Sequence, residues 1–132
     1  MVDGLVSSLL LLLGGGLGAN ARYWLGVFVR TLQGPVAFPI ATLLINVGGS
    51  FCLGFCVTFF RNHPDPSRKY WYLLLGTGLC GGFTTFSTFS LETLELLQQN
   101  RLIAASAYVF GSVFAAIFGV WLALKLSGGR IV

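Results

Sequence analysis

One stretch of the chain is clearly polar, the segment RNHPDPSRK at residues 61–69, and nearly everything on either side of it is apolar. Only 9% of the 132 residues are charged, whereas soluble domains carry about 25%. Such a chain lacks the polar surface that a globule needs in water. The composition therefore excludes a soluble enzyme, a secreted disulfide scaffold and a disordered protein, and it predicts a membrane protein.

Four membrane-spanning helices would use nearly the whole length. A spanning helix needs about 20 apolar residues, and the apolar runs predict spans at about 5–29, 38–60, 70–97 and 102–126. We therefore expect a single domain over residues 1–132, an all-α membrane protein with four transmembrane helices. Small residues drive helix packing in lipid, so the glycines at 14, 15, 16 and 18 would let the first helix approach its neighbours closely.

The third span is too long and too rich in glycine to be one continuous helix. At 1.5 Å per residue it would extend roughly 40 Å, against a hydrocarbon core of about 30 Å. Its centre reads GTGLCGGFTTFSTFS at 76–90, and paired glycines followed by threonines hold a helix poorly. We predict a break near Gly81–Thr84. Carbonyls released there are tolerated in mid-membrane only when buried in protein, or lining a cavity or ion site.

The basic residues indicate only a weak preference for one orientation. With four spans, the termini and the 61–69 loop share one side of the membrane. That side carries Arg61, Arg68, Lys69, Lys125 and Arg130, and the other carries Arg30 and Arg101, with Arg22 if it reaches that surface. The excess favours cytoplasmic termini under the positive-inside rule, but it is small enough for insertion in both orientations.

Nothing in the chain has the pattern of a catalytic or metal-ligating cluster. The cysteines Cys52, Cys56 and Cys80 lie within apolar runs without a histidine or carboxylate close by in sequence. We interpret them as small buried thiols rather than as a disulfide or a zinc site. Without a nucleophile–base pair or a phosphate-binding loop either, the chain is not expected to be an enzyme.

A few polar side chains lie inside or at the ends of the predicted spans. Asn46 is in the middle of the second span, and Thr42 lies one turn earlier on the same face. Asn46 could form an interhelical hydrogen bond or donate to an ion in a pore. Arg22 could extend to the headgroups or attract an anion at a vestibule. Glu92 and Glu95, near the end of the third span, are interpreted as interfacial residues.

Phenylalanines recur every three residues after the predicted break, at Phe83, Phe86 and Phe89. Such a stripe is usually core packing, but here hydroxyl side chains alternate with the rings, at Thr84, Thr85, Ser87, Thr88 and Ser90. A phenyl ring has a positive edge, so it can attract a small anion without a full charge. Packing and anion contact both remain open for this segment.

Three sequence strings together resemble a known family. They are GGGLGANARYWLG at 14–26, Asn46 followed by Gly48–Gly49, and above all GGFTTFSTFSLET at 81–93. They resemble the small bacterial fluoride channels of the Fluc or CrcB family, over all four spans. The resemblance implies a multi-pass protein of the bacterial inner membrane, an antiparallel dual-topology homodimer with two pores for passive, selective fluoride export along the subunit interface.

The resemblance also implies roles for individual residues. Phe86 and Phe89 would line the pore, and Asn46 would donate to the anion. The remaining family positions are Arg22 near the vestibule, Thr42, Tyr108 and Ser112 on a polar track, and the backbone carbonyls of Gly81 and Thr84 around a structural Na⁺ at the dimer centre. One position departs from the pattern, since Ala116 stands where some relatives have a serine one turn after Ser112.

Two other classes explain less of the sequence. A small multidrug-resistance-like exporter is also a four-span dual-topology dimer. That class resembles a proton-coupled antiporter with a carboxylate in its first span, and the first span here has no acidic residue after Asp3. A non-transporting assembly protein would explain the glycines. It would not explain an asparagine, a broken helix and an alternating Phe/hydroxyl segment together.

Overall fold

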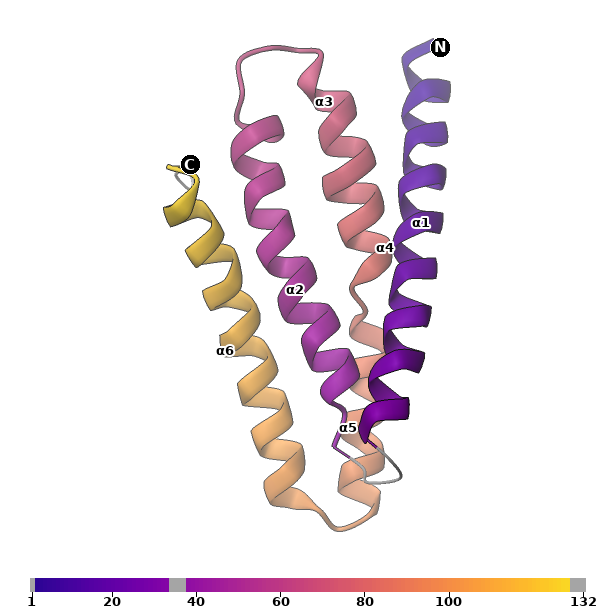
Figure 1. The fold of residues 1–132 in the computed structure, drawn as a ribbon, viewed down its shortest axis with the longest axis vertical. Helices are drawn as coiled ribbons and strands as arrows, with labels where there is room; N and C mark the ends of the chain where they lie inside the picture. The colour runs from indigo at the N-terminus through magenta and orange to yellow at the C-terminus, as the bar shows by residue number, and fades with distance from the viewer. Residues whose placement is uncertain (1, 34–37, 129–132) are drawn as a thin grey trace.

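The computed structural model describes residues 2–33 and 38–128, and it is helical almost throughout (Figure 1). The helical segments are α1 (Val2–Gln33), α2 (Ile40–Cys56), η1 (Val57–Arg61), α3 (Arg68–Trp71), η2 (Tyr72–Cys80), α4 (Gly81–Phe83), α5 (Phe86–Gln98) and α6 (Leu102–Leu126). The η segments are π-helical, with wider turns than an α-helix. Within the described ranges there is no strand, which confirms the all-α expectation.

Three continuous helices are long and apolar enough to cross a membrane, at residues 3–33, 40–61 and 102–126. They correspond to the first, second and fourth predicted spans. α1 extends beyond the predicted 5–29 and has Arg30 in its last turn, where a cation is favourable beside the helix C-terminus. The third predicted span is the interrupted segment 68–98, and its crossing of a membrane stays a prediction.

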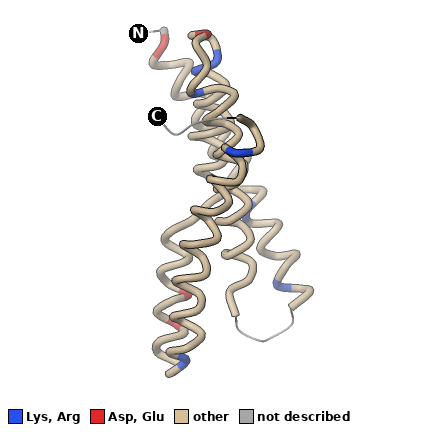
Figure 2. Tube along the Cα trace, turned by 90° about the vertical axis from the view of Figure 1, so that its left-hand side faces the viewer, with Lys and Arg blue, Asp and Glu red and all other residues tan. Residues whose placement is uncertain are grey.

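The described chain has both of its ends in the same half of the molecule, together with the α2–α3 connection, while α5 joins α6 at the opposite end (Figure 1). Basic residues lie mostly toward the two ends of the helical rods (Figure 2). In the α2–α3 connection, His63 is exposed. The Ser67 backbone N–H donates to Asp65 Oδ1 at 2.9 Å and holds the pKa of that carboxyl below its usual value. Arg130 lies outside the described residues.

Glycines let α1 lie directly against the first half of the broken segment. Gly14 is buried against the backbone of Leu74, and Gly18 against the backbone of Leu79. A methyl group at either glycine would collide with a main-chain carbonyl oxygen. Gly16, in contrast, has open space beside it, so only part of the predicted glycine cluster packs within this chain.

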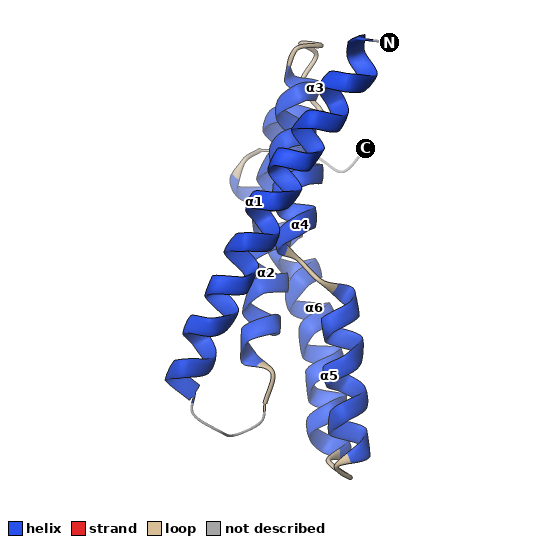
Figure 3. Cartoon of the chain, turned by 90° about the vertical axis from the view of Figure 1, so that its right-hand side faces the viewer, coloured by secondary structure: helices blue, strands red, loops and turns tan. Residues whose placement is uncertain are grey.

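The break changes which helix the chain packs against. Before it, η2 and α4 pack on α1; after it, α5 packs on α6 and separates from α1 (Figure 3). The α2 helix contacts both halves of the broken segment as well as α6. The break therefore lies where α1, α2 and the two halves of the third segment come closest, and this position makes it the centre of the candidate site.

Few of the apolar side chains are buried within the chain. A small core forms around Leu96, Ala105 and Tyr108, whereas large side chains such as Leu12, Phe110 and Phe114 are exposed. Such exposed apolar surface suits lipid or a partner chain. Among the cysteines, Cys56 and Cys80 are buried, but Cys52 is exposed. The expectation of three buried thiols is therefore wrong for Cys52, because that position of α2 faces away from its neighbours.

Candidate functional site

The predicted break in the third segment is confirmed at Thr84 and Thr85, directly after α4. Thr84 is extended, with φ −78° and ψ 159°, and Thr85 is extended, with φ −151° and ψ 120°. A new helix starts at once because the Thr85 hydroxyl caps α5: it accepts a hydrogen bond from the Thr88 backbone N–H at 3.2 Å. Two extended residues thus separate the helices.

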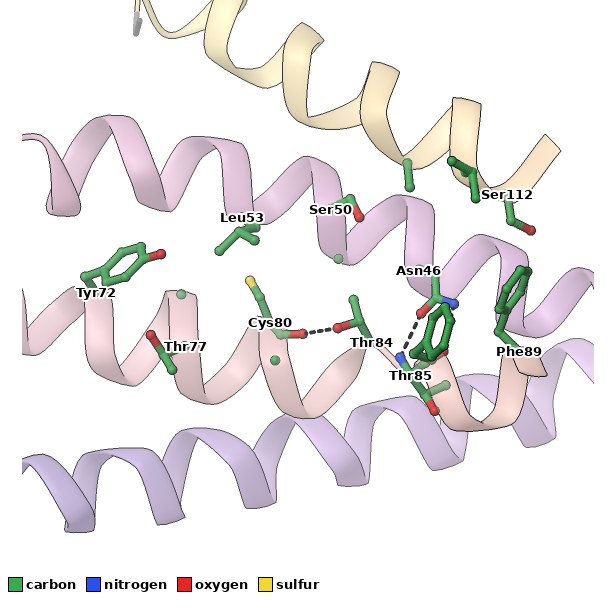
Figure 4. Close-up of a pocket in the computed structure, with 16 residues that line it drawn as sticks. Asn46, Ser50, Leu53, Tyr72, Thr77, Cys80, Thr84, Thr85, Phe89 and Ser112 are labelled. Carbon is green, nitrogen blue, oxygen red and sulfur yellow. Dashed lines mark hydrogen bonds between the residues drawn. The ribbon is translucent and has the colours of Figure 1, made fainter. Parts of the chain in front are cut away.

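The Asn46 side chain closes the gap in the backbone hydrogen bonding. The Thr85 backbone N–H donates to Asn46 Oδ1 at 2.8 Å, and Asn46 Nδ2 donates to the Thr85 carbonyl at 3.0 Å (Figure 4). Of the two roles left open for Asn46, the structure therefore shows the interhelical hydrogen bond. An amide nitrogen has two N–H groups, so one donor of Asn46 is left over after the contact with Thr85.

Carbonyl groups collect on the α4 side of the break. In a continuous helix, the Thr85 N–H would donate to the Gly81 carbonyl, but here it donates to Asn46. The Thr84 carbonyl accepts from Arg22 Nη1 at 3.2 Å. Arg22 is half-buried on α1, so it reaches the break instead of extending to the headgroups.

A buried polar cluster joins α2, α5 and α6 beyond the break. Thr42 Oγ1 donates to Glu92 Oε1 at 2.9 Å, and the Tyr108 hydroxyl donates to Glu92 Oε2 at 2.7 Å. Thr42 is 3% exposed and Tyr108 is fully buried. Glu92 is half-buried, and both of its carboxylate oxygens accept hydrogen bonds from other helices, a contact that the interfacial interpretation did not include. Glu92 follows Phe89 by three residues and so lies on the same face of the helix. This spacing could have indicated that Glu92 faces the other helices.

The two aromatic residues of α5 differ in their surroundings. The Phe86 ring lies 5.6 Å from that of Phe89, and the Phe89 ring lies 5.0 Å from that of Tyr108. Phe86 is 79% exposed, so it contributes little to packing within the chain. Phe89 is half-buried at the edge of the small core. The rings thus form a line from an exposed position to the Glu92 cluster.

A cavity of about 510 Å³ lies beside the break, between α2, the broken segment and α6 (Figure 4). The predicted site residues that line it are Asn46, Gly81, Thr84, Phe86, Phe89 and Ser112, and Ala116 also lines it. Ser112 is 5% exposed, and its hydroxyl has no hydrogen-bond partner among the described residues. A buried hydroxyl of this kind normally has a partner, so Ser112 offers a free donor to a ligand in the cavity.

A second cavity of about 420 Å³ lies on the α1 side of the break. The predicted residues Arg22 and Thr42 line it, together with Arg30, Thr85 and Thr88. Two guanidinium groups and several hydroxyls make this cavity attractive to an anion. The structure thus divides the predicted site residues between two cavities, which meet at Thr85, and places Tyr108 in the core between helices.

Comparison with known proteins identifies the family. The family model described as CrcB-like protein, Camphor Resistance (CrcB), matches residues 9–124. The chain belongs to the CrcB-like family. This CrcB-like protein is 47% identical over 119 residues to the fluoride-specific ion channel FluC of Oceanobacillus iheyensis, covering 90% of this chain and 89% of that one. It is 42% identical to the fluoride-specific ion channel FluC of Pyrococcus furiosus, covering 89% of this chain and 93% of that one.

Family membership and the apolar helices agree on where this CrcB-like protein resides. It is an integral, multi-pass protein of the inner membrane. The resemblance carried by the GGFTTFSTFSLET string is therefore confirmed at the level of the family.

Proposed function

We propose that this CrcB-like protein is a passive, fluoride-selective ion channel that exports fluoride across the membrane and so relieves fluoride toxicity. It acts as a channel and not as an enzyme. The relatives that carry the name fluoride-specific ion channel support the substrate. The observation that carries the proposal is the Ser112 hydroxyl, buried without a partner in a cavity that also contains Phe86, Phe89 and Asn46.

The proposed pathway replaces the water around fluoride with fixed donors. Fluoride is small and strongly hydrated, so a pore must offer it hydrogen-bond donors in place of the water that it loses. Leaving a hydrogen-bonding group unpaired along the path would be costly. Arg22 attracts the anion into the second cavity, and Asn46 meets it with its spare N–H at the break. The ring edges of Phe86 and Phe89 carry it through the apolar section.

The polar track lies beyond the rings. Ser112 supplies its free hydroxyl, while Thr42 and Tyr108 donate to Glu92 in the state described. An anion that reaches these two hydroxyls therefore has to compete with the Glu92 carboxylate. Because Ala116 has no hydroxyl, the track ends one turn earlier than in relatives with serine at that position.

The channel is proposed to have four transmembrane segments per chain and to assemble as an antiparallel, dual-topology homodimer with two pores along the interface. Support comes from polar residues that the single chain leaves exposed on the broken segment, at Thr77, Ser87, Thr88 and Ser90. Facing lipid, polar groups at this depth would be unfavourable. Gly81 and Gly111 also have open space beside them, which lets a second backbone approach.

A structural Na⁺ at the dimer centre is the proposed partner of the released carbonyls. Na⁺ is a hard cation that suits backbone oxygen, and Gly81 and Thr84 offer carbonyls outside regular helical pairing. The open space beside Gly81 fits a contact outside the single chain. The ion would link the broken segments of two protomers, while Arg22 and Asn46 hold the break in shape from within each chain.

Flux measurements on purified protein in liposomes test the proposal. Fluoride efflux should need only a fluoride gradient and an ionophore that compensates charge, and chloride efflux should be far slower. Chloride transport at a comparable rate would contradict fluoride selectivity. Strict dependence on a pH gradient would contradict a passive channel and favour a proton-coupled exporter.

A further inference from the structure

We propose that the hydroxyl groups of Ser50, Tyr72 and Thr77 form a second fluoride-binding position, in the half of the molecule that contains the termini. This position rests on the proposed function and deepens it, because the polar track described above lies on the other side of the break. An anion that arrives from the terminal half would meet these three hydroxyls before it reaches Asn46.

Ser50 continues a polar face of α2. Thr42, Asn46 and Ser50 follow one another at intervals of four residues, so they lie on one face of the helix. The first two are hydrogen-bonded to other segments, Thr42 to Glu92 and Asn46 to Thr85. Ser50 is half-buried, and its hydroxyl has no hydrogen-bond partner among the described residues. The polar face therefore ends in a free donor, one turn beyond Asn46.

Many helical serines and threonines use their hydroxyl on their own backbone, by donating to the carbonyl four residues earlier. This chain has that arrangement at Ser8, Thr58, Ser90 and Thr93. Ser50 in α2 and Thr77 in η2 make no such bond within the part of the chain that the structure describes. Their hydroxyls are therefore available to a ligand.

Tyr72 contributes the third hydroxyl, from the first turn of η2. Its ring packs so closely on Gly76, one turn later, that a methyl group at Gly76 would collide with it. Figure 4 shows the hydroxyl pointing away from η2, into the space beside Leu53 of α2. No described residue exchanges a hydrogen bond with it. The contact with Gly76 thus holds the ring, and the ring presents a free hydroxyl.

The three residues border a single cavity. Ser50, Tyr72 and Thr77 all line the cavity of about 510 Å³ beside the break. In Figure 4 they lie to one side of Asn46, whereas Ser112 lies to the other. The described lining contains no charged side chain. Conduction requires binding that is weak enough for the ion to leave, and neutral hydroxyl donors meet that requirement for an anion.

A bond to the second copy is the competing explanation for these hydroxyls, because Thr77 is exposed in the single chain. If the hydroxyls bonded across the proposed dimer, removing them would weaken the dimer. If they bind fluoride, removing them lowers fluoride binding and flux while the dimer persists. The two explanations therefore differ in a quantity that can be measured.

The test uses the full chain in detergent and in liposomes, with Ser50→Ala, Tyr72→Phe and Thr77→Val. Each change removes a hydroxyl and alters the side-chain volume little. Each should lower fluoride flux about tenfold, the effect of losing one hydrogen bond to the ion, while the protein still elutes as a dimer. Fluoride should raise the melting temperature of the wild type above its value in chloride at equal sodium concentration, and it should raise that of the variants less.

Two further variants serve as controls. Ser106 is exposed on α6 and does not line the cavity, so Ser106→Ala should match the wild type in flux and in its response to fluoride. Thr77→Ser keeps a hydroxyl and should recover most of the flux that Thr77→Val loses.

Two outcomes would overturn the proposal. One is wild-type flux and a wild-type response to fluoride in all three variants. The other is loss of the dimer in parallel with loss of flux, which would assign the hydroxyls to the interface. A wild type that fluoride stabilises but that conducts no fluoride would contradict the proposed function alone. The melting temperatures of the variants would then still decide whether these hydroxyls bind the ion.

Discussion

The side-chain amide of Asn46 takes the place of a peptide group at the break. Its oxygen accepts a hydrogen bond from the Thr85 N–H, and its nitrogen donates one to the Thr85 carbonyl. Changing Asn46→Asp keeps the acceptor but places a second acceptor opposite the Thr85 carbonyl. Leaving a buried carbonyl without its donor costs about 1–3 kcal/mol. We expect a clearly lower melting temperature of the detergent-solubilised protein, together with loss of flux. The same change at exposed Asn62 is the control, and equal melting temperatures for the two variants would contradict the clamp.

The rings of Phe86 and Phe89 can be tested by a change that keeps apolar volume. Replacing either with Ile usually costs under about 1.5 kcal/mol, so folding and dimerisation should survive. If the ring edges contact fluoride, flux falls by orders of magnitude while the protein still elutes as a dimer. Phe83, which packs beside Gly49 on the glycine side of the break, should tolerate Ile better. Near-wild-type efflux from both variants would show that these rings only pack.

Among the elements, α1 and η2 depend on two glycines for their close contact. Gly18→Ala would push a methyl group into the Leu79 carbonyl, and overpacking of this kind typically costs about 1–3 kcal/mol. Gly16→Ala is the matched control on the same helix, because nothing lies near its side. There the change should be neutral or stabilising, since Ala favours a helix by up to about 1 kcal/mol. Thermal unfolding of both variants measures the difference.

The break itself is tested by Gly81→Val and Thr84→Ser. A side chain at Gly81 meets open space within the chain, so a single protomer should fold normally. Flux should nevertheless be abolished, because the added bulk crowds the proposed ion and the partner's approach. Thr84→Ser retains the hydroxyl that donates to the Cys80 carbonyl and should keep function. Normal efflux from Gly81→Val would argue against a central ion site.

Sequence reasoning located the break because paired glycines and threonines act locally, through weak helix propensity. It could not decide the role of Asn46, since that depends on which backbone atoms α2 meets after folding. The hydrogen bonds of Glu92 could not be predicted for the same reason, because its partners, Thr42 and Tyr108, come from two other helices. The π-helical turns of η2 also had no local signal, and they accompany the close backbone contact of Gly78 with Gly14.

For the whole molecule, the near balance of flanking charge predicts that both orientations are populated in one membrane. Single cysteines at Asn62 and Asn100, in a background without Cys52, Cys56 and Cys80, would be probed with an impermeant thiol reagent in intact cells. These positions lie at opposite ends of the helical rods, so each should label partially. Complete labelling of one and complete protection of the other would mean a single fixed orientation, and the antiparallel dimer would be wrong.

The contact of Asn46 with Thr85 has a consequence for assembly. In an antiparallel β-sheet, two opposite residues can form a pair in which the backbone N–H of each donates to the carbonyl of the other. Here the side-chain amide of Asn46 takes the place of one of the two backbones. The N–H and the carbonyl of Thr85 are thus satisfied inside one chain, whereas the Gly81 carbonyl loses its helical donor. A single protomer can therefore keep its break in shape before the proposed second copy arrives, and what that copy would add is a partner for the Gly81 carbonyl and for the exposed polar side chains of the broken segment.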